Sequence, residues 1–227
     1  MPMEQPPVDS TLNIVDRFAE EGVARLISDL GNPLLMPPAV FLATCLLLGQ
    51  SLLSTVQITG IAVICYSVLP FLLTIAMFRR GIIHSLDLPL RKTRTILYAF
   101  SIVSAAIASL IIYQLIPTLH FFIFVLSLVV LANLSISFLL NLRWKVSVQS
   151  ASVSVAGTIY YLMFLWGITE YQNITLILSL IHLLLLLPVM MWARYHLSVH
   201  SLTELFGGAT AGILLTIIEL IILTNIW

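Results

Sequence analysis

Six long apolar runs, separated by short polar breaks, constrain this chain more than any other feature of its sequence. Each run has close to the ~20 residues that an α-helix needs to cross ~30 Å of hydrocarbon. Backbone N–H and C=O groups must be satisfied within the bilayer, so such runs are expected to be helical. The runs cover residues 56–78, 95–116, 119–142, 148–169, 174–192 and 202–226. A shorter apolar stretch that contains prolines covers residues 34–53.

Composition agrees with a protein that lies in the bilayer. Hydrophobic residues make up 60% of the 227 positions and charged residues only 9%, and the mean hydropathy is +1.09. We predict an all-α, polytopic integral membrane helix bundle with six or seven transmembrane helices, seven if the 34–53 stretch crosses. The ten basic and ten acidic residues give a net charge of zero, so no nucleic-acid partner is expected.

The first 32 residues differ from the bundle that follows. Apolar side chains recur at helical spacing from Leu12 to Leu30 and acidic side chains fall between them, which is the pattern of an amphipathic helix. A Gly-Asn-Pro sequence at 31–33 ends this pattern. We therefore divide the chain into an N-terminal tail with an amphipathic helix, residues 1–32, and a transmembrane bundle, residues 33–227.

Basic residues gather in three loops that are separated by pairs of apolar runs. Loops with this spacing lie on the same membrane face, which the positive-inside rule assigns to the cytoplasm. Arginines that bind phosphate would produce the same pattern, so two causes predict it. The loops contain eight of the ten basic residues: Arg79, Arg80, Arg91, Lys92, Arg94, Arg143, Lys145 and Arg194.

Hydroxyl groups and histidines accompany the cations in these loops. Arginine forks suit phosphate oxygens, and the N–H groups at helix N-termini add partial positive charge. His200 and Glu204 are four residues apart, so they share one face at the start of the last helix. A neutral imidazole in this setting can attack phosphorus while a carboxylate orients it. The pattern therefore predicts a phosphate-binding site.

These segments resemble the type 2 phosphatidic acid phosphatase and haloperoxidase superfamily, in its compact bacterial membrane form. The resemblance covers most of the chain, from Leu26 onward. Residues 26–37 look like the start of that group's first helix, and residues 88–94 (LPLRKTR) look like its first, basic motif. Residues 144–149 (WKVSVQ) are similar to the second motif. Residues 193–204 (ARYHLSVHSLTE) are similar to the third motif, the most specific of the three.

The resemblance implies roles for individual residues. It implies that His200 is the nucleophile and that Glu204 fills the orienting position usually held by aspartate. Gln149 stands where a histidine normally protonates the leaving group. An amide has no proton to give at neutral pH, and general acid catalysis is worth ~10²–10⁴ in rate, so weak or absent hydrolysis is expected. The implied phosphate ligands are Arg91, Arg94, Lys145, Ser147 and Arg194.

The predicted function is a membrane-embedded, phosphatase-like protein of the bacterial cytoplasmic membrane. It would bind or hydrolyse a lipid or isoprenoid phosphate or pyrophosphate without a metal or other cofactor, and it would contact membrane lipids. His84 or His196 would replace the missing acid if the fold brings either one near. The alternative, supported by Gln149, is a catalytically inactive structural or lipid- or pigment-binding subunit that has other membrane subunits as partners.

Polar and small residues inside the runs have structural interpretations. A carboxylate is expensive in hydrocarbon, and for Glu219 we favour snorkelling to the interface over proton or ion handling. The small-xxx-small pattern of Gly208 and Gly212 predicts a close approach between helices. We interpret His120 and His182 as hydrogen-bonded packing residues.

Overall fold

The computed structural model describes residues 14–83, 91–115, 117 and 119–225. Within these residues it contains helices and turns and no strand, which confirms the predicted all-α class. The elements are α1 (Ile14–Leu30), α2 (Met36–Leu47), α3 (Leu52–Ala62), η1 (Val63–Val68), α4 (Leu69–Arg79), α5 (Arg91–Gln114), α6 (Phe121–Arg143), α7 (Val148–Leu165), α8 (Gln172–Leu180), η3 (Ile181–Leu186), α9 (Leu187–His196) and α10 (Leu202–Asn225).

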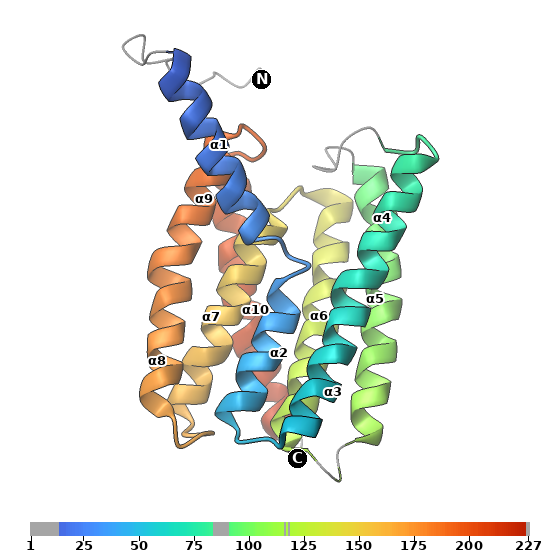
Figure 1. Ribbon diagram of the computed structural model, residues 1–227, viewed down its shortest axis with the longest axis vertical. Coiled ribbons are helices and arrows are strands. Elements are labelled where there is room, and N and C mark those ends of the chain that lie inside the picture. Colours follow the sequence, from blue (N-terminus) through green and yellow to red (C-terminus); the bar gives the residue numbers. More distant parts are fainter. Residues whose placement is uncertain (1–13, 84–90, 116, 118, 226–227) are drawn as a thin grey trace.

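Six helices of the described chain are long and apolar enough to cross a membrane. Two of them are composite, because α3, η1 and α4 form one continuous helix, and α8, η3 and α9 form another. The others are α5, α6, α7 and α10. They run up and down in alternation, so that the C-terminal ends of α4, α6 and α9 lie at the same end of the bundle (Figure 1). The chain is thus an integral membrane helix bundle with its basic loops at one end.

The 34–53 stretch does not form a seventh helix of spanning length. Helix α2 has 12 residues, which at 1.5 Å per residue is ~18 Å, well short of ~30 Å of hydrocarbon. The chain turns just after α2 at Gly49, whose φ of 61° is the left-handed conformation that glycine adopts without strain. The Gln50 N–H bonds back to the Cys45 carbonyl, 3.0 Å away, as in a Schellman cap. The hydroxyl of Ser51 then caps the start of α3.

Both composite helices contain a π-helical segment immediately before a Leu-Pro pair. Proline has no N–H and its ring displaces the carbonyl four residues back, so regular α-helical bonding fails there. The Leu69 N–H, just before Pro70, reaches the carbonyl of Ile64, five residues back. The Leu187 N–H, just before Pro188, does the same with His182. The wider π turn lets each helix continue past its proline.

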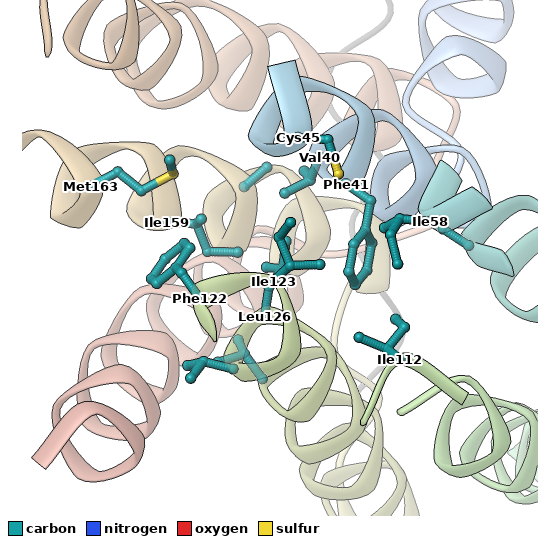
Figure 2. Packing of buried hydrophobic residues seen from close by; sticks show 14 of the residues in the cluster. Val40, Phe41, Cys45, Ile58, Ile112, Phe122, Ile123, Leu126, Ile159 and Met163 are labelled. Atoms are coloured by element: carbon teal, nitrogen blue, oxygen red, sulfur yellow. The ribbon is translucent and has the colours of Figure 1, made fainter. Parts of the chain in front are cut away.

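The main hydrophobic core forms around the short helix α2 (Figure 2). Phe41 of α2 is fully buried and stacks on Tyr66 of η1, with ring centroids 5.6 Å apart. Ile112, Ile123 and Ile159 bring side chains from α5, α6 and α7 to the same cluster. One face of α2 is buried in this cluster, while Leu42 and Leu46 on its other face are exposed. Through the buried face, α2 joins the spanning helices at its own end of the bundle.

Helix α1 is present at Ile14–Leu30, where the sequence predicts an amphipathic helix. The side chains of residues 14–20 and the segment 1–13 lie outside the described residues, so the amphipathic character of α1 stays a prediction. The second half of α1 packs against α9. This contact brings α1 to the end of the bundle where the basic loops meet (Figure 1).

Candidate functional site

His200 and Glu204 form a bonded pair at the start of α10. Nδ1 of His200 lies 2.8 Å from Oε2 of Glu204. The same carboxylate oxygen accepts the Ser201 N–H at 3.3 Å, while the Ser201 hydroxyl accepts the Glu204 N–H at 3.4 Å. This reciprocal arrangement is a capping box, which fixes the Glu204 side chain against the backbone. The predicted pairing of the histidine and the carboxylate is therefore present, on a rigid helix start.

The loop that carries His200 is shaped by the end of α9. Ser198 has a φ of 53°, which is uncommon for a residue other than glycine. Its neighbour Val199 donates its N–H to the Arg194 carbonyl at 3.2 Å, the long bond of a Schellman cap. The Val199 carbonyl in turn accepts a hydrogen bond of 3.0 Å from Nζ of Lys145. The α9 cap thus links the loop of His200 to the segment between α6 and α7.

A second link joins that segment to α10. The N–H of Ser147 donates to the Glu204 carbonyl at 3.0 Å, and the hydroxyl of Ser147 lies 3.1 Å from that of Ser150 at the start of α7. Ser147 is fully buried. In this conformation the Ser147 N–H and hydroxyl are hydrogen-bonded to Glu204 and Ser150. The implied role of Ser147 as a phosphate ligand stays a prediction.

Helices α7 and α10 approach closely enough to make this contact because glycines line α10. A Cβ atom added to Gly208 would lie 2.3 Å from the Ser147 carbonyl oxygen. At Gly212 it would lie 2.7 Å from the Ala151 carbonyl oxygen. The close approach predicted from the small-xxx-small pattern is confirmed, and it sets the position of Glu204 relative to the 144–147 segment.

Three cations from separate elements act on the His200 imidazole. Burial lowers the pKa of His200 most, the hydrogen bond to Glu204 raises it, and the positive charges of Arg194, Arg94 and Lys145 lower it. The net result is a pKa well below the ordinary value for histidine. His200 is therefore neutral at pH 7 in this environment.

The two arginines of this cluster are buried, and Lys145 is half-buried. Arg94, in the first turns of α5, is 8% exposed, and Arg194, in the last turn of α9, is 6% exposed. Burial lowers the pKa of Lys145, Glu204 raises it, and the charges of the two arginines lower it further. Three mutually repelling cations around one carboxylate form an electropositive cluster that an anion would stabilise.

Ser28 of α1 contacts two of the predicted site residues, and sequence analysis gave it no role. Its hydroxyl accepts a hydrogen bond of 2.8 Å from Arg194, and its carbonyl accepts one of 2.7 Å from Nε2 of Gln149. Oε1 of Gln149 is buried and has no hydrogen-bond partner among the described residues. The one sequence signal that pointed to Ser28 was its position in residues 26–37, the segment that looks like the start of the first helix in the phosphatase superfamily.

The remaining predicted residues are placed as follows. The side chains of residues 91–93 lie outside the described residues, so the position of the Arg91 side chain is untested. The same holds for His84. His196 is exposed and stacks on Trp192, with ring centroids 5.4 Å apart. Arg79, Arg80 and Arg143 are exposed at the basic end.

No match to this chain was found among protein-family models, curated proteins or solved structures. We therefore infer the function from the contacts and charges around His200.

His120 and His182 have structural roles. His120 accepts the Phe122 N–H at 3.2 Å and caps α6 at the opposite end of the bundle. Nδ1 of His182 lies 2.7 Å from the Leu178 carbonyl oxygen within its own helix, and the ring packs on Tyr160. Both agree with the predicted packing interpretation.

Glu219 of α10 is only 9% exposed. Its Oε2 accepts a hydrogen bond of 2.5 Å from Nδ2 of Asn133 in α6. The Asn133 amide also lies 3.4 Å from the hydroxyl of Thr216, one turn before Glu219. The prediction that Glu219 snorkels to the interface is wrong, because its side chain turns inward and bonds to a neighbouring helix.

Proposed function

We propose that this integral membrane protein binds the phosphate group of a lipid or isoprenoid phosphate at its basic end and hydrolyses it through His200. The observation that supports the proposal is the 2.8 Å contact between His200 and Glu204 within the field of three cations. Neutral histidine, oriented by a carboxylate and surrounded by positive charge, is the arrangement that nucleophilic attack on phosphorus requires.

The chemistry follows from the tautomer that the hydrogen bond selects. With its Nδ1–H donated to Glu204, His200 has its lone pair on Nε2. Nε2 would form a bond to phosphorus as the P–O bond to the lipid alcohol breaks, and the departing oxygen would take a proton from water. A second water molecule would then hydrolyse the phosphohistidine and release phosphate. Arg94, Lys145 and Arg194 would stabilise the charge on the phosphoryl oxygens.

Access to this site requires a movement of α1. His200 is 5% exposed and Arg194 is 6% exposed, and Ser28 already bonds to the Arg194 guanidinium. A phosphate that binds Arg194 would replace the Ser28 hydroxyl. The substrate would enter sideways from the leaflet as α1 separates from α9.

A second candidate function is a binding protein or complex subunit without catalytic activity. Gln149 favours it, because an amide does not protonate a leaving group and because its N–H holds the Ser28 carbonyl at 2.7 Å. In this case the cations would bind the headgroup of an anionic lipid, and no phosphohistidine would form.

Phosphate release separates the two candidates. The purified protein is incubated in detergent with phosphatidic acid or an isoprenyl pyrophosphate, and released phosphate is measured for wild type, His200→Asn and Gln149→His. Catalysis by His200 predicts that His200→Asn abolishes a measurable wild-type rate. Gln149→His is expected to raise that rate by ~10²–10⁴, the usual value of a general acid.

The matched control is His120→Asn, the same substitution at the opposite end of the bundle, where asparagine also caps a helix well. It is expected to keep the wild-type rate. Release only from Gln149→His, together with binding of phosphatidic acid by wild type, would select the non-catalytic candidate. Neither release nor phosphatidic acid binding in any of these proteins would overturn both.

A further inference from the structure

Helix α1 ends against the electropositive cluster of the candidate site. Ser28 lies in the last turn of α1 and is only 4% exposed. Nη1 of Arg194 donates to its hydroxyl at 2.8 Å, and Nε2 of Gln149 lies 3.4 Å from the same oxygen. The Gln149 amide also donates to the Ser28 carbonyl at 2.7 Å. Donors from α9 and α7 therefore converge on the two oxygens of one residue of α1.

The electrostatics of a helix end favour this contact. The C-terminal end of a helix has unpaired carbonyls and a partial negative charge, which a basic residue in the last turn stabilises. The last turn of α1 contains no basic residue. Arg194, in the last turn of α9, supplies the positive charge instead, and the Gln149 amide satisfies one of the last four carbonyls of α1. The end of α1 thus offers the cations what a phosphate would offer, which is oxygen atoms that carry negative charge.

The rest of the contact between α1 and α9 is made by small residues. Ala24 is fully buried, and a Cβ atom added to Gly31 would lie 1.7 Å from Cε of Met190 in α9. The larger apolar side chains of Val23 and Leu26 turn outward and are 52% and 61% exposed. Because small side chains bury little apolar area, hydrophobic packing stabilises the docked position of α1 only weakly. The hydrogen bonds of Ser28 are therefore a large part of what holds α1 in place.

We propose that α1 is an autoinhibitory plug, in which Ser28 occupies the anion subsite formed by Arg194 and Gln149 until a substrate phosphate displaces it. The inference rests on the proposed function, and it gives Gln149 the role of a hydrogen-bond donor to phosphate. No covalent step is involved. Phosphate oxygens replace the two oxygens of Ser28 as acceptors of the same N–H groups, and α1 then separates from α9.

Competition of this kind has a signature that a simple binding site lacks. Phosphate binds only to the open form, so its apparent Kd is the intrinsic Kd divided by the open fraction. Loss of a contact that holds α1 closed raises the open fraction and therefore tightens phosphate binding. If Ser28 instead helped to bind the phosphate, loss of its hydroxyl would weaken binding.

The affinity of Ser28→Ala for phosphate tests this sign. The Kd values of the purified proteins in detergent, for inorganic phosphate and for phosphatidic acid in mixed micelles, are measured from the ligand-dependent rise in Tm. We expect Ser28→Ala to bind about tenfold more tightly than wild type, the lower end for one hydrogen bond to a charged group. A response to both probes supports a plug that any phosphate displaces, and a response to phosphatidic acid only supports one that a lipid headgroup displaces.

The matched control is Ser109→Ala. Ser109 is also a buried serine, and its hydroxyl donates to the Ser127 carbonyl toward the opposite end of α5 from Arg94. This variant is expected to keep the wild-type Kd. A Kd of Ser28→Ala equal to or weaker than that of wild type would overturn the plug.

Hydrogen exchange of α1 gives a second readout that needs no catalytic activity. The amides of residues 21–31 should exchange faster when inorganic phosphate or phosphatidic acid binds, because a helix of 17 residues loses protection when it leaves its neighbour. Ser28→Ala should show faster exchange without any addition. Phosphate binding by wild type that leaves this exchange unchanged or slows it would overturn the plug and leave the proposed function standing. Absence of binding of both probes in wild type and in Ser28→Ala would instead overturn the proposed function, and the plug with it.

Discussion

The residue with the most unusual environment is His200, which is buried beside three cations and one carboxylate. Burial and the charges of Arg194, Arg94 and Lys145 lower its pKa to about 4, although the hydrogen bond to Glu204 opposes them. The unfolded chain has a histidine with an ordinary pKa of ≈ 6.5. Between pH 4 and 6.5 the unfolded state therefore binds more protons than the folded state. Stability is fully present above this window and falls as the pH drops through it.

We expect this coupling to appear as a pH-dependent melting temperature. Wild type and His200→Asn are melted in detergent at pH 7.5 and at pH 4.5. The wild-type Tm should fall more than that of His200→Asn. Only the wild type has an imidazole at position 200, and at pH 4.5 this group gains a proton when the protein unfolds, which favours the unfolded state. An equal fall in both proteins would contradict the low pKa of His200.

At the scale of elements, the contact between α7 and α10 positions the site. Glu204 and His200 are at the start of α10, and the 144–147 segment leads into α7. The backbone bond from Ser147 to Glu204 joins them. This bond exists only because Gly208 lets the two backbones approach.

Gly208→Ala is therefore expected to destabilise the protein by ~1–3 kcal/mol, the typical cost of overpacking. The added Cβ would lie 2.3 Å from a backbone oxygen, which does not rotate away as a side chain does. The measurement is Tm in detergent. Gly60→Ala is the matched control, because Gly60 is in a spanning helix and a Cβ there meets nothing within 4 Å. A Tm for Gly208→Ala at or above that of Gly60→Ala would contradict the tight α7–α10 contact.

At the scale of the whole molecule, the basic loops are separated by pairs of spanning helices, and this spacing determines that they share a membrane face. The six spanning helices place the C-terminal ends of α4, α6 and α9 at one end of the bundle and the C-terminal ends of α5 and α7 at the other (Figure 1). Helix α2 is too short to add a seventh spanning helix. The basic residues therefore face one aqueous compartment.

Labelling of single cysteines tests that topology. In a background with Cys45→Ala and Cys65→Ala, exposed residues are replaced one at a time: Arg80→Cys, Thr203→Cys and Tyr171→Cys. A maleimide that does not cross membranes is applied to sealed vesicles. Positions 80 and 203 should react from the same side and position 171 from the other. Labelling of 80 and 171 from one side would contradict the six-span arrangement.

The apolar runs by themselves determined the class of the fold and placed the limits of the spanning helices to within four residues, because the bilayer leaves a spanning segment no alternative to the helix. Periodicity of four residues was also enough to pair His200 with Glu204, and the small-xxx-small pattern was enough to predict a close helix contact. These are local signals, which do not depend on how the helices are arranged. The prediction for the 34–53 stretch left six or seven spans open, because a left-handed Gly49 was not visible in its hydropathy.

Only the tertiary structure decided which distant residues meet. The contact of Ser28 with Gln149 and Arg194 joins residues more than 100 positions apart, and no local pattern specifies it. The bond between Asn133 and Glu219 likewise depends on which faces of α6 and α10 turn toward each other. Helix faces are chosen by packing over the whole bundle, and hydropathy is nearly uniform around a helix that contacts lipid on one side and apolar neighbours on the other. The sequence therefore specified the helices, and packing specified the sites between them.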